Sequence, residues 1–170
     1  LKDQLTRDRL ATADLSAGRV LFEKTCANCH QMYGRGGKIG PNLTGAQRDN
    51  MDYWLHNIVD PDAVVSADYR ATQVLTEDGR ILVGLVTERT RRTITLVSAE
   101  QTWTLADDEI LESRMMNQSP MPSGLLQTFD DDQTANLIAY LSHPTQVALP
   151  EGVQSPLDMA PPAESAKNSE

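Results

Sequence analysis

The sequence predicts a mainly α-helical fold with a small antiparallel β insertion between the second helix and the last one. Apolar residues recur at helical spacing on both sides of residues 69–113, whereas inside that range they alternate with polar residues. The length of 170 residues suits one domain with an insertion and loose ends. We therefore expect a polar lead-in at residues 1–14, a domain at residues 15–143 and a disordered, Pro- and Ser-rich tail at residues 144–170.

Three helices are predicted from the spacing of their apolar residues. The first runs over about residues 16–26 with Ser16 as its N-cap, and the second over about residues 48–59. The third follows Thr128, an expected N-cap that has Asp131 three residues later, as in an acidic capping box. The apolar stripes consist of Ala17, Val20 and Leu21 in the first helix, Met51, Trp54, Leu55, Ile58 and Val59 in the second, and Thr134, Leu137, Ile138 and Leu141 in the third.

The segment between the second and third helices changes from the helical period to a period of two. The stretches "RILVGLVTE", "RTITLVS" and "TWTL" alternate in this way, and "EDG" at residues 77–79 is typical of a hairpin turn. We therefore expect about four short strands between roughly residues 69 and 113.

The charge of the chain limits its partners. A formal net charge of −9 argues against a nucleic-acid-binding surface and favours a protein partner with a basic docking face. No apolar run approaches the roughly 20 residues that span a bilayer, so no transmembrane segment is expected. Because the chain opens at Leu1, the sequence leaves open whether a signal peptide has been removed.

The stretch "TCANCHQMYGRGGKIGPNLTG" contains the only two cysteines of the chain, Cys26 and Cys29, followed directly by His30. A zinc half-site would need a second ligand pair, but His56 and His143 stand alone. A redox dithiol favours a helix N-terminus, whereas Cys26 is expected at the C-terminal end of a helix. A covalent haem site is complete, because each thiol can add to one vinyl group while His30 reaches the iron. The spacing therefore favours one covalently attached haem c.

An iron held by one histidine has a sixth position to fill. Met121 is the favoured candidate, because Pro120 and Pro122 restrict the backbone on both sides of it and would hold its thioether in place. Packing or surface exposure explains the remaining candidates more simply. These are Met115, Met116, His56 and His143.

Four segments resemble class I cytochromes c: "GRVLFEKTCANCH", "GPNLTG", "DYR…DGRILVGLV" and "MPSGLLQTFDDDQTANLIAYL". Together they span roughly residues 17–142. The third segment is part of the β insertion and points to a narrower group, the haem-binding C-terminal modules of dehydrogenase-like proteins of planctomycete and verrucomicrobial bacteria. The resemblance implies the class I cytochrome c helical fold, with the β insertion placed before the loop that carries the distal methionine.

The resemblance also implies a role for each site residue. His30 would be the proximal iron ligand and Met121 the distal one, and the carbonyl of Pro41 would accept the imidazole N–H of His30. Leu43 would pack on the haem, and Trp54 would donate to a haem propionate, a role that Tyr53 could fill instead. The same resemblance places Gly18 and Phe22 of the first helix against Tyr140 of the last.

These roles describe a carrier of single electrons between periplasmic redox proteins, because an iron with two protein ligands has no free position for substrate. Covalent haem attachment implies an exported, periplasmic-type location. An alternative is a haem-based ligand sensor or a peroxidase-like enzyme, which would need a labile sixth ligand. His30 and Met121 are 91 residues apart, which keeps that alternative open. The sequence also leaves open whether the chain acts alone or as the electron-transfer module of a larger dehydrogenase, and its oligomeric state.

Overall fold

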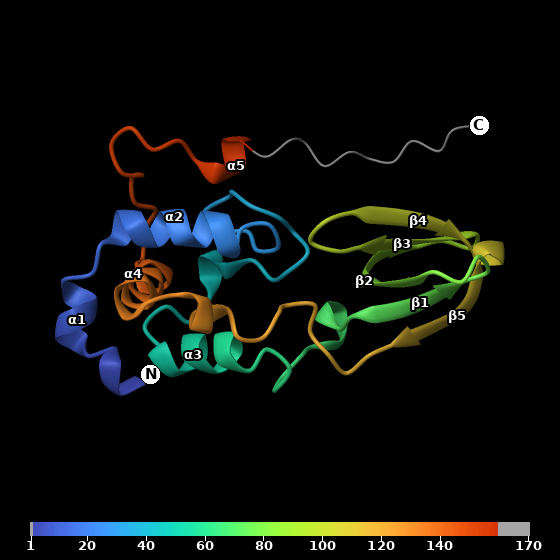
Figure 1. Cartoon of the computed structure of the whole chain (residues 1–170), viewed down its shortest axis with the longest axis horizontal. Helices are drawn as coiled ribbons and strands as arrows, with labels where there is room; N and C mark the ends of the chain where they lie inside the picture. The colour runs from blue at the N-terminus through green and yellow to red at the C-terminus, as the bar shows by residue number, and fades with distance from the viewer. Residues whose placement is uncertain (1, 160–170) are drawn as a thin grey trace. The chain divides into compact units, whose positions relative to one another are not determined.

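The computed structural model describes residues 2–159, which divide into two compact units. A helical unit contains residues 2–63 and 122–159, and a sheet unit contains residues 64–121 (Figure 1). None of the described helices is long and apolar enough to cross a membrane.

The helical unit consists of five α-helices and three short 3-10 turns within the described residues. The α-helices are α1 (Arg7–Ala11), α2 (Leu15–Thr25), α3 (Met51–Val59), α4 (Asp131–Ser142) and α5 (Pro156–Met159). The 3-10 turns are η1 (Lys2–Gln4), η2 (Leu43–Gly45) and η5 (Leu125–Thr128).

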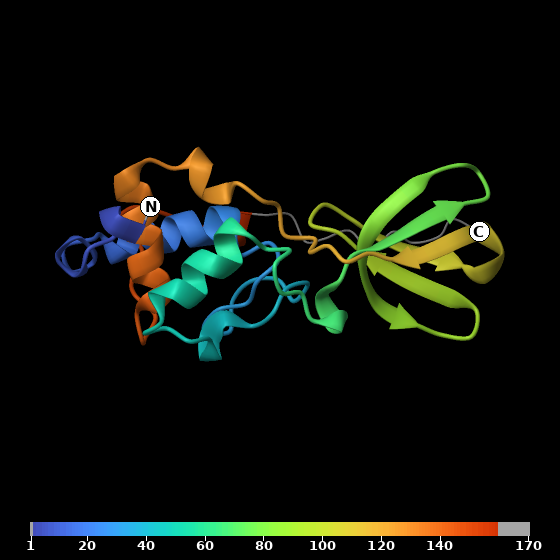
Figure 2. The same cartoon turned by 90° about the horizontal axis from the view of Figure 1, so that it is seen from below.

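The centre of the helical unit is the close crossing of α2 and α4, which Figures 1 and 2 show from two directions. At the crossing point α2 carries Gly18, and a Cβ atom added there would lie 2.0 Å from the backbone oxygen of Asn136. Beside it the rings of Phe22 and Tyr140 pack with their centroids 5.6 Å apart. The predicted contact of Gly18 and Phe22 with Tyr140 is therefore confirmed.

The helix starts differ from those expected. Asp14, not Ser16, caps α2, because its side chain accepts the backbone N–H of Ala17 at 3.0 Å. At α4 the cap is Asp130 instead of Thr128, and Asp130 and Gln133 form a reciprocal capping box. In both cases an aspartate near the expected position provides the carboxylate that also suits the positive end of the helix dipole.

The buried Tyr140 should make the helical unit less stable at alkaline pH. Burial raises the pKa of its phenol to about 12, because the ionised form would lose its hydration. An unfolded tyrosine ionises near pH 10, so the unfolded chain releases its proton first and stability falls as pH rises from about 10 to about 12. We expect a loss of roughly 2–3 kcal/mol over that interval. Urea unfolding at several pH values measures it.

The comparison for this prediction is Tyr140→Phe, which keeps the ring but has no ionisable group. Its stability should fall less steeply than that of the unchanged protein above pH 10, although it loses the hydrogen bond to the Gln146 side chain at 2.9 Å. Equal slopes for the two proteins would show that Tyr140 does not cause the loss.

The segment after α4 returns along α2 and is tied to it by charged side chains. Glu23 is almost fully buried and accepts hydrogen bonds from Arg19 Nε, at 2.7 Å, and from the hydroxyl of Ser155. Arg19 also donates to the carbonyl of Val147 at 2.6 Å. Arg35, from the loop after the histidine, donates to Ser155 at 3.1 Å and pairs with an aspartate of α5, Asp158.

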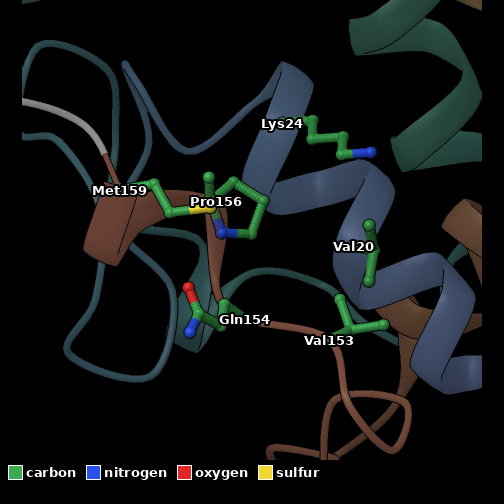
Figure 3. Close-up of a pocket in the computed structure, with 6 residues that line it drawn as sticks. All are labelled: Val20, Lys24, Val153, Gln154, Pro156 and Met159. Atoms are coloured by element: carbon green, nitrogen blue, oxygen red, sulfur yellow. The ribbon is translucent and has the colours of Figure 1, made fainter.

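A pocket lies between this segment and α2 (Figure 3). Val20 and Lys24 line it from α2, and Val153, Gln154, Pro156 and Met159 line it from the returning segment. The tail predicted to be disordered covers residues 144–170, of which residues 160–170 lie outside the described part of the chain. The described part, residues 144–159, includes α5 and these contacts with α2.

The sheet unit is one antiparallel sheet of five strands with the order β4-β3-β2-β1-β5. Its strands are β1 (Thr72–Thr76), β2 (Ile81–Arg89), β3 (Thr93–Val97), β4 (Thr102–Ala106) and β5 (Ile110–Met115), and η3 (Ala67–Tyr69) and η4 (Asp107–Glu109) are its 3-10 turns. The long strand β2 pairs with β1 through its first half and with β3 through its second half. The sheet has its own core, formed by Val74, Leu82, Ile94, Leu96 and Leu105.

The predicted fold class, mainly α with a small insertion, is wrong. Of the described residues, 36% are helical and 20% are in strands, and the sheet has five strands instead of about four. The insertion is not small, because it buries an apolar cluster of its own and forms a separate compact unit. The fifth strand was missed because "ILESRM" lacks alternation: all its residues after Ile110 are exposed.

Candidate functional site

The two cysteines and the histidine lie on a tight turn that follows α2 directly. Cys26 is the C-cap of α2, and its carbonyl accepts the backbone N–H groups of Cys29, at 3.1 Å, and of His30, at 2.9 Å. Both thiols are free and partly exposed. The sequence thus places two thiols and an imidazole within one backbone turn whose geometry is fixed by its own hydrogen bonds.

The environment of the thiols does not suit dithiol redox chemistry. Burial, together with the neighbouring Cys29, raises the pKa of Cys26 to about 12, and burial also raises the pKa of Cys29. Thiol–disulfide exchange needs a thiolate, which these positions disfavour. The arrangement instead keeps two free, partly exposed thiols within one turn, where each could form a thioether with a prosthetic group.

His30 is held in the orientation and protonation state of a metal ligand. Its Nδ1 lies 2.9 Å from the carbonyl oxygen of Pro41. A carbonyl can only accept, so Nδ1 carries the proton and Nε2 keeps a free lone pair. Burial lowers the pKa of His30, more than the hydrogen bond to Pro41 raises it, and this favours the neutral imidazole that binds iron.

The glycine-rich loop from Gly34 to Gly40 wraps closely around this turn. Gly37 donates its backbone N–H to the carbonyl of Ala27 at 2.7 Å, and Gly40 donates to that of Cys29 at 2.8 Å. At Gly40 a Cβ atom would lie only 2.6 Å from Cε1 of the His30 ring. The ring therefore packs against bare backbone, and a larger residue at this position would displace it.

Leu43 and Trp54 complete the predicted set in the helical unit. Leu43 is half-buried, begins η2, and donates its backbone N–H to the carbonyl of Gln31 at 2.8 Å. Trp54 is buried in α3, and its Nε1 has no hydrogen-bond partner among the described residues. A buried indole N–H normally finds an acceptor. An unsatisfied indole N–H, two free thiols and a free imidazole lone pair in one unit are the groups that a haem can satisfy, because its propionates are strong acceptors.

Sequence reasoning missed a clamp that fixes the loop after the histidine. Arg48 lies over the ring of Tyr33, 4.7 Å from its centroid, and donates to the Tyr33 hydroxyl and to the backbone oxygens of Thr44 and His143. Tyr33 also donates to the His143 carbonyl at 2.6 Å, and its backbone is left-handed, with φ of 51°. The clamp ties two loops to the end of α4. No pattern in the sequence marks these residues, because their contacts are distant in the chain.

Met121 is not among the residues that the helical unit brings together. It is the last residue of the sheet unit, and its backbone N–H donates to the hydroxyl of Ser119 at 3.1 Å. Of the other candidates for the sixth ligand, Met115 is exposed on β5 and His56 is exposed on α3. His143 caps α4 and uses its Nδ1 in a contact with the carbonyl of Thr145 at 2.7 Å.

Residues 15–78 match the family model described as Cytochrome c. The match covers less than half of the chain and ends before Met121. It contains the remaining predicted site residues, namely Cys26, Cys29, His30, Pro41, Leu43 and Trp54. No curated protein matches the chain, so the narrower resemblance to planctomycete modules has no relative to support it. The chain thus carries a cytochrome c domain at residues 15–78, which supports covalent haem binding and electron transport.

Proposed function

We propose that the protein is a monohaem c-type cytochrome that carries single electrons between redox proteins. The observation that carries the proposal is the state of His30: its Nδ1 is committed to the Pro41 carbonyl and its Nε2 is left for a metal, one turn away from two free thiols. A zinc site would need further ligands, and the described residues contain no group of three or more His, Cys, Asp or Glu side chains that could hold a metal ion. A redox dithiol would need an accessible thiolate, which the raised pKa of both cysteines disfavours.

In this proposal Cys26 and Cys29 would hold the haem by two thioether bonds, and His30 and Met121 would be the protein ligands of its iron. A thioether ligand favours the ferrous state and raises the reduction potential. Bound haem supplies an iron that changes between ferrous and ferric without gaining or losing a ligand. The protein fixes the His30 ring through Pro41, and Trp54, whose Nε1–H has no partner among the described residues, would donate to a propionate.

The partners in this proposal are redox proteins with a basic docking face, because the chain carries a net charge of −9. Attraction of this kind raises the association rate, and salt screens it. We place the protein in an exported, periplasmic-type location, either alone or as the electron-transfer part of a larger dehydrogenase.

The visible spectrum of the haem-loaded protein tests Met121. The ferric protein should show the weak red band of thioether-bound iron, and Met121→Ala should abolish it. Met115→Ala and Met116→Ala are the matched controls and should keep the band. A band that is absent from the unchanged protein, or that survives in Met121→Ala, would assign the sixth position elsewhere. Rapid binding of carbon monoxide to the unchanged ferrous protein would then favour a ligand sensor or a peroxidase-like enzyme.

Gly40→Ala tests the packing around His30. The added Cβ would push the ring away from its place against the backbone and weaken the Nδ1 hydrogen bond to Pro41. A weaker hydrogen bond makes the imidazole less basic and destabilises the ferric state. Losing a bond of about 1 kcal/mol should raise the reduction potential by roughly 40 mV, as a redox titration measures. Gly45→Ala is the control, because nothing lies within 4 Å of its added Cβ, and it should leave the potential unchanged.

A further inference from the structure

Strand β5 is an open edge of the sheet. Within the described residues it pairs with β1 on one side only, and it lies at the border of the sheet opposite to β4 (Figure 1). Every residue from Leu111 to Met115 is exposed. An exposed edge strand presents unpaired backbone N–H and C=O groups to a further strand, so proteins usually protect it or use it.

The charged residues of β5 have no partner within their own sheet. Glu112 lies opposite Leu75 of β1, and Arg114 lies opposite Gln73. Neither charge forms an ion pair with any described residue. One carboxylate and one guanidinium therefore stand on the same face of an edge strand, on either side of Ser113.

The geometry of antiparallel pairing limits how two copies of β5 can meet. Residues that face each other must both direct their N–H and C=O groups toward the partner strand, or both away from it. In a symmetric pair of identical strands the two-fold axis therefore passes through a residue. If it passes through Ser113, then Glu112 of each copy faces Arg114 of the other, and Leu111 faces Met115.

We propose that β5 pairs with β5 of a second copy of this chain, antiparallel and centred on Ser113, to form a two-fold dimer. This register gives two opposite-charge pairs across the strands, which stabilise an antiparallel pair. It also covers Leu111 and Met115, whose exposed fractions are 60% and 59%. Shifting the axis to Glu112 or Arg114 would instead place like charges opposite each other.

The other edge strand does not offer the same match. Strand β4, with the sequence "TWTLA", carries no charge, so neither a β4–β4 pair nor a head-to-tail β4–β5 pair would satisfy Glu112 and Arg114. The β5 pair is short, because the ladder with β1 shifts between Leu75 and Thr76 and leaves Leu111 without a partner on β1. A short strand pair buries little surface, so we expect a weak dimer. The dimer does not depend on the haem.

A charge-swap cycle tests the register. Sedimentation velocity of the haem-loaded chain should show a monomer–dimer equilibrium between about 10 µM and about 1 mM, a range that covers weak complexes. Glu112→Arg and Arg114→Glu each replace two attractive pairs with two repulsive ones, and should weaken the dimer by about tenfold or more. The double variant Glu112→Arg with Arg114→Glu restores opposite charges and should restore the dimer. A protein that stays monomeric up to about 1 mM, or a double variant as weak as the single ones, would overturn the proposal.

Disulfide cross-linking tests the symmetry axis. Under the proposed function both natural cysteines would be in thioethers in the haem-loaded protein, so Ser113→Cys would add a single free thiol and the unsubstituted protein should not cross-link. Directly opposed strand residues have Cα atoms about 4.5–5.5 Å apart, a separation that a disulfide spans. Mild oxidation should therefore link Ser113→Cys into a covalent dimer, whereas Thr104→Cys on the exposed face of β4 should stay monomeric. Equal cross-linking of the two variants, or linking of Thr104→Cys alone, would contradict pairing through β5.

Discussion

Gly18→Ala should destabilise the helical unit by about 3 kcal/mol or more, because the crossing of α2 and α4 has no room for a methyl group. The added Cβ would lie 2.0 Å from the backbone oxygen of Asn136 and 2.8 Å from Cβ of Tyr140. Neither neighbour is the flexible end of a side chain, so the two helices would have to move apart. Thermal unfolding followed by the helical circular dichroism signal measures the loss.

Gly45→Ala is the matched control for this change. It adds the same methyl group in the same unit, where nothing lies within 4 Å, and should leave the unfolding temperature nearly unchanged. If Gly18→Ala is as stable as Gly45→Ala, the helices do not cross as closely as described. A variant of Gly18 that fails to fold at all agrees with the prediction, provided that Gly45→Ala folds and binds haem normally.

Glu23→Ala should cost about 3 kcal/mol, because it leaves a buried arginine without its carboxylate. The side chains of Arg19 and Glu23 are 12% and 2% exposed, so solvent can replace little of the lost interaction. Ser155 would lose its acceptor as well, so the segment that returns along α2 would lose one of the contacts that hold it. Urea unfolding gives the loss of stability, and limited proteolysis should show earlier cleavage within residues 144–159.

Lys2→Ala provides the comparison with an exposed pair. Lys2 and Asp52 lie 2.5 Å apart, but their side chains are 59% and 67% exposed, and a pair of this kind contributes about 0.5 kcal/mol or less. Glu23→Gln should fall between the two, because it keeps acceptor and donor atoms but loses the charge. Equal effects of Glu23→Ala and Lys2→Ala would mean that burial of the pair does not matter.

The local parts of the site were predictable from the sequence. Cys26, Cys29 and His30 lie together because they are close in the sequence and share one turn, and α2 and α3 follow from the periodicity of their apolar residues. The helix caps were missed by two residues at both α2 and α4. Ser16 and Thr128 are acceptable caps in isolation, but the aspartates Asp14 and Asp130 also complement the helix dipole.

The parts that depend on distant contacts were not predictable. Arg48 and Tyr33 both donate to the carbonyl of His143 at the end of α4, more than 90 residues later in the chain. The spacing of the residues around them does not predict this contact. Glu23 and Arg19 look like an exposed i,i+4 pair in the sequence, because their partners Val147 and Ser155 come from a distant segment of the chain. The fifth strand was missed for a similar reason: β5 belongs to the sheet through its pairing with β1, not through an apolar face of its own.

The pairing of β1 with β5 means that the sheet unit begins and ends on neighbouring strands. Thr72 lies opposite Met115, and Ala71 exchanges backbone hydrogen bonds with Met116 and Gln118. Once these strands have paired, residues 64–70 and 117–121 connect the strands to the helical unit. The entropy lost when the chain rejoins the helical unit at Pro122 is then that of closing a loop of roughly a dozen residues, not that of closing the whole segment 64–121. Because its first and last strands are neighbours, the folded sheet adds only a short loop to the helical unit. A five-stranded sheet of this kind can therefore be inserted into, or removed from, a helical domain at a small cost in loop-closure entropy.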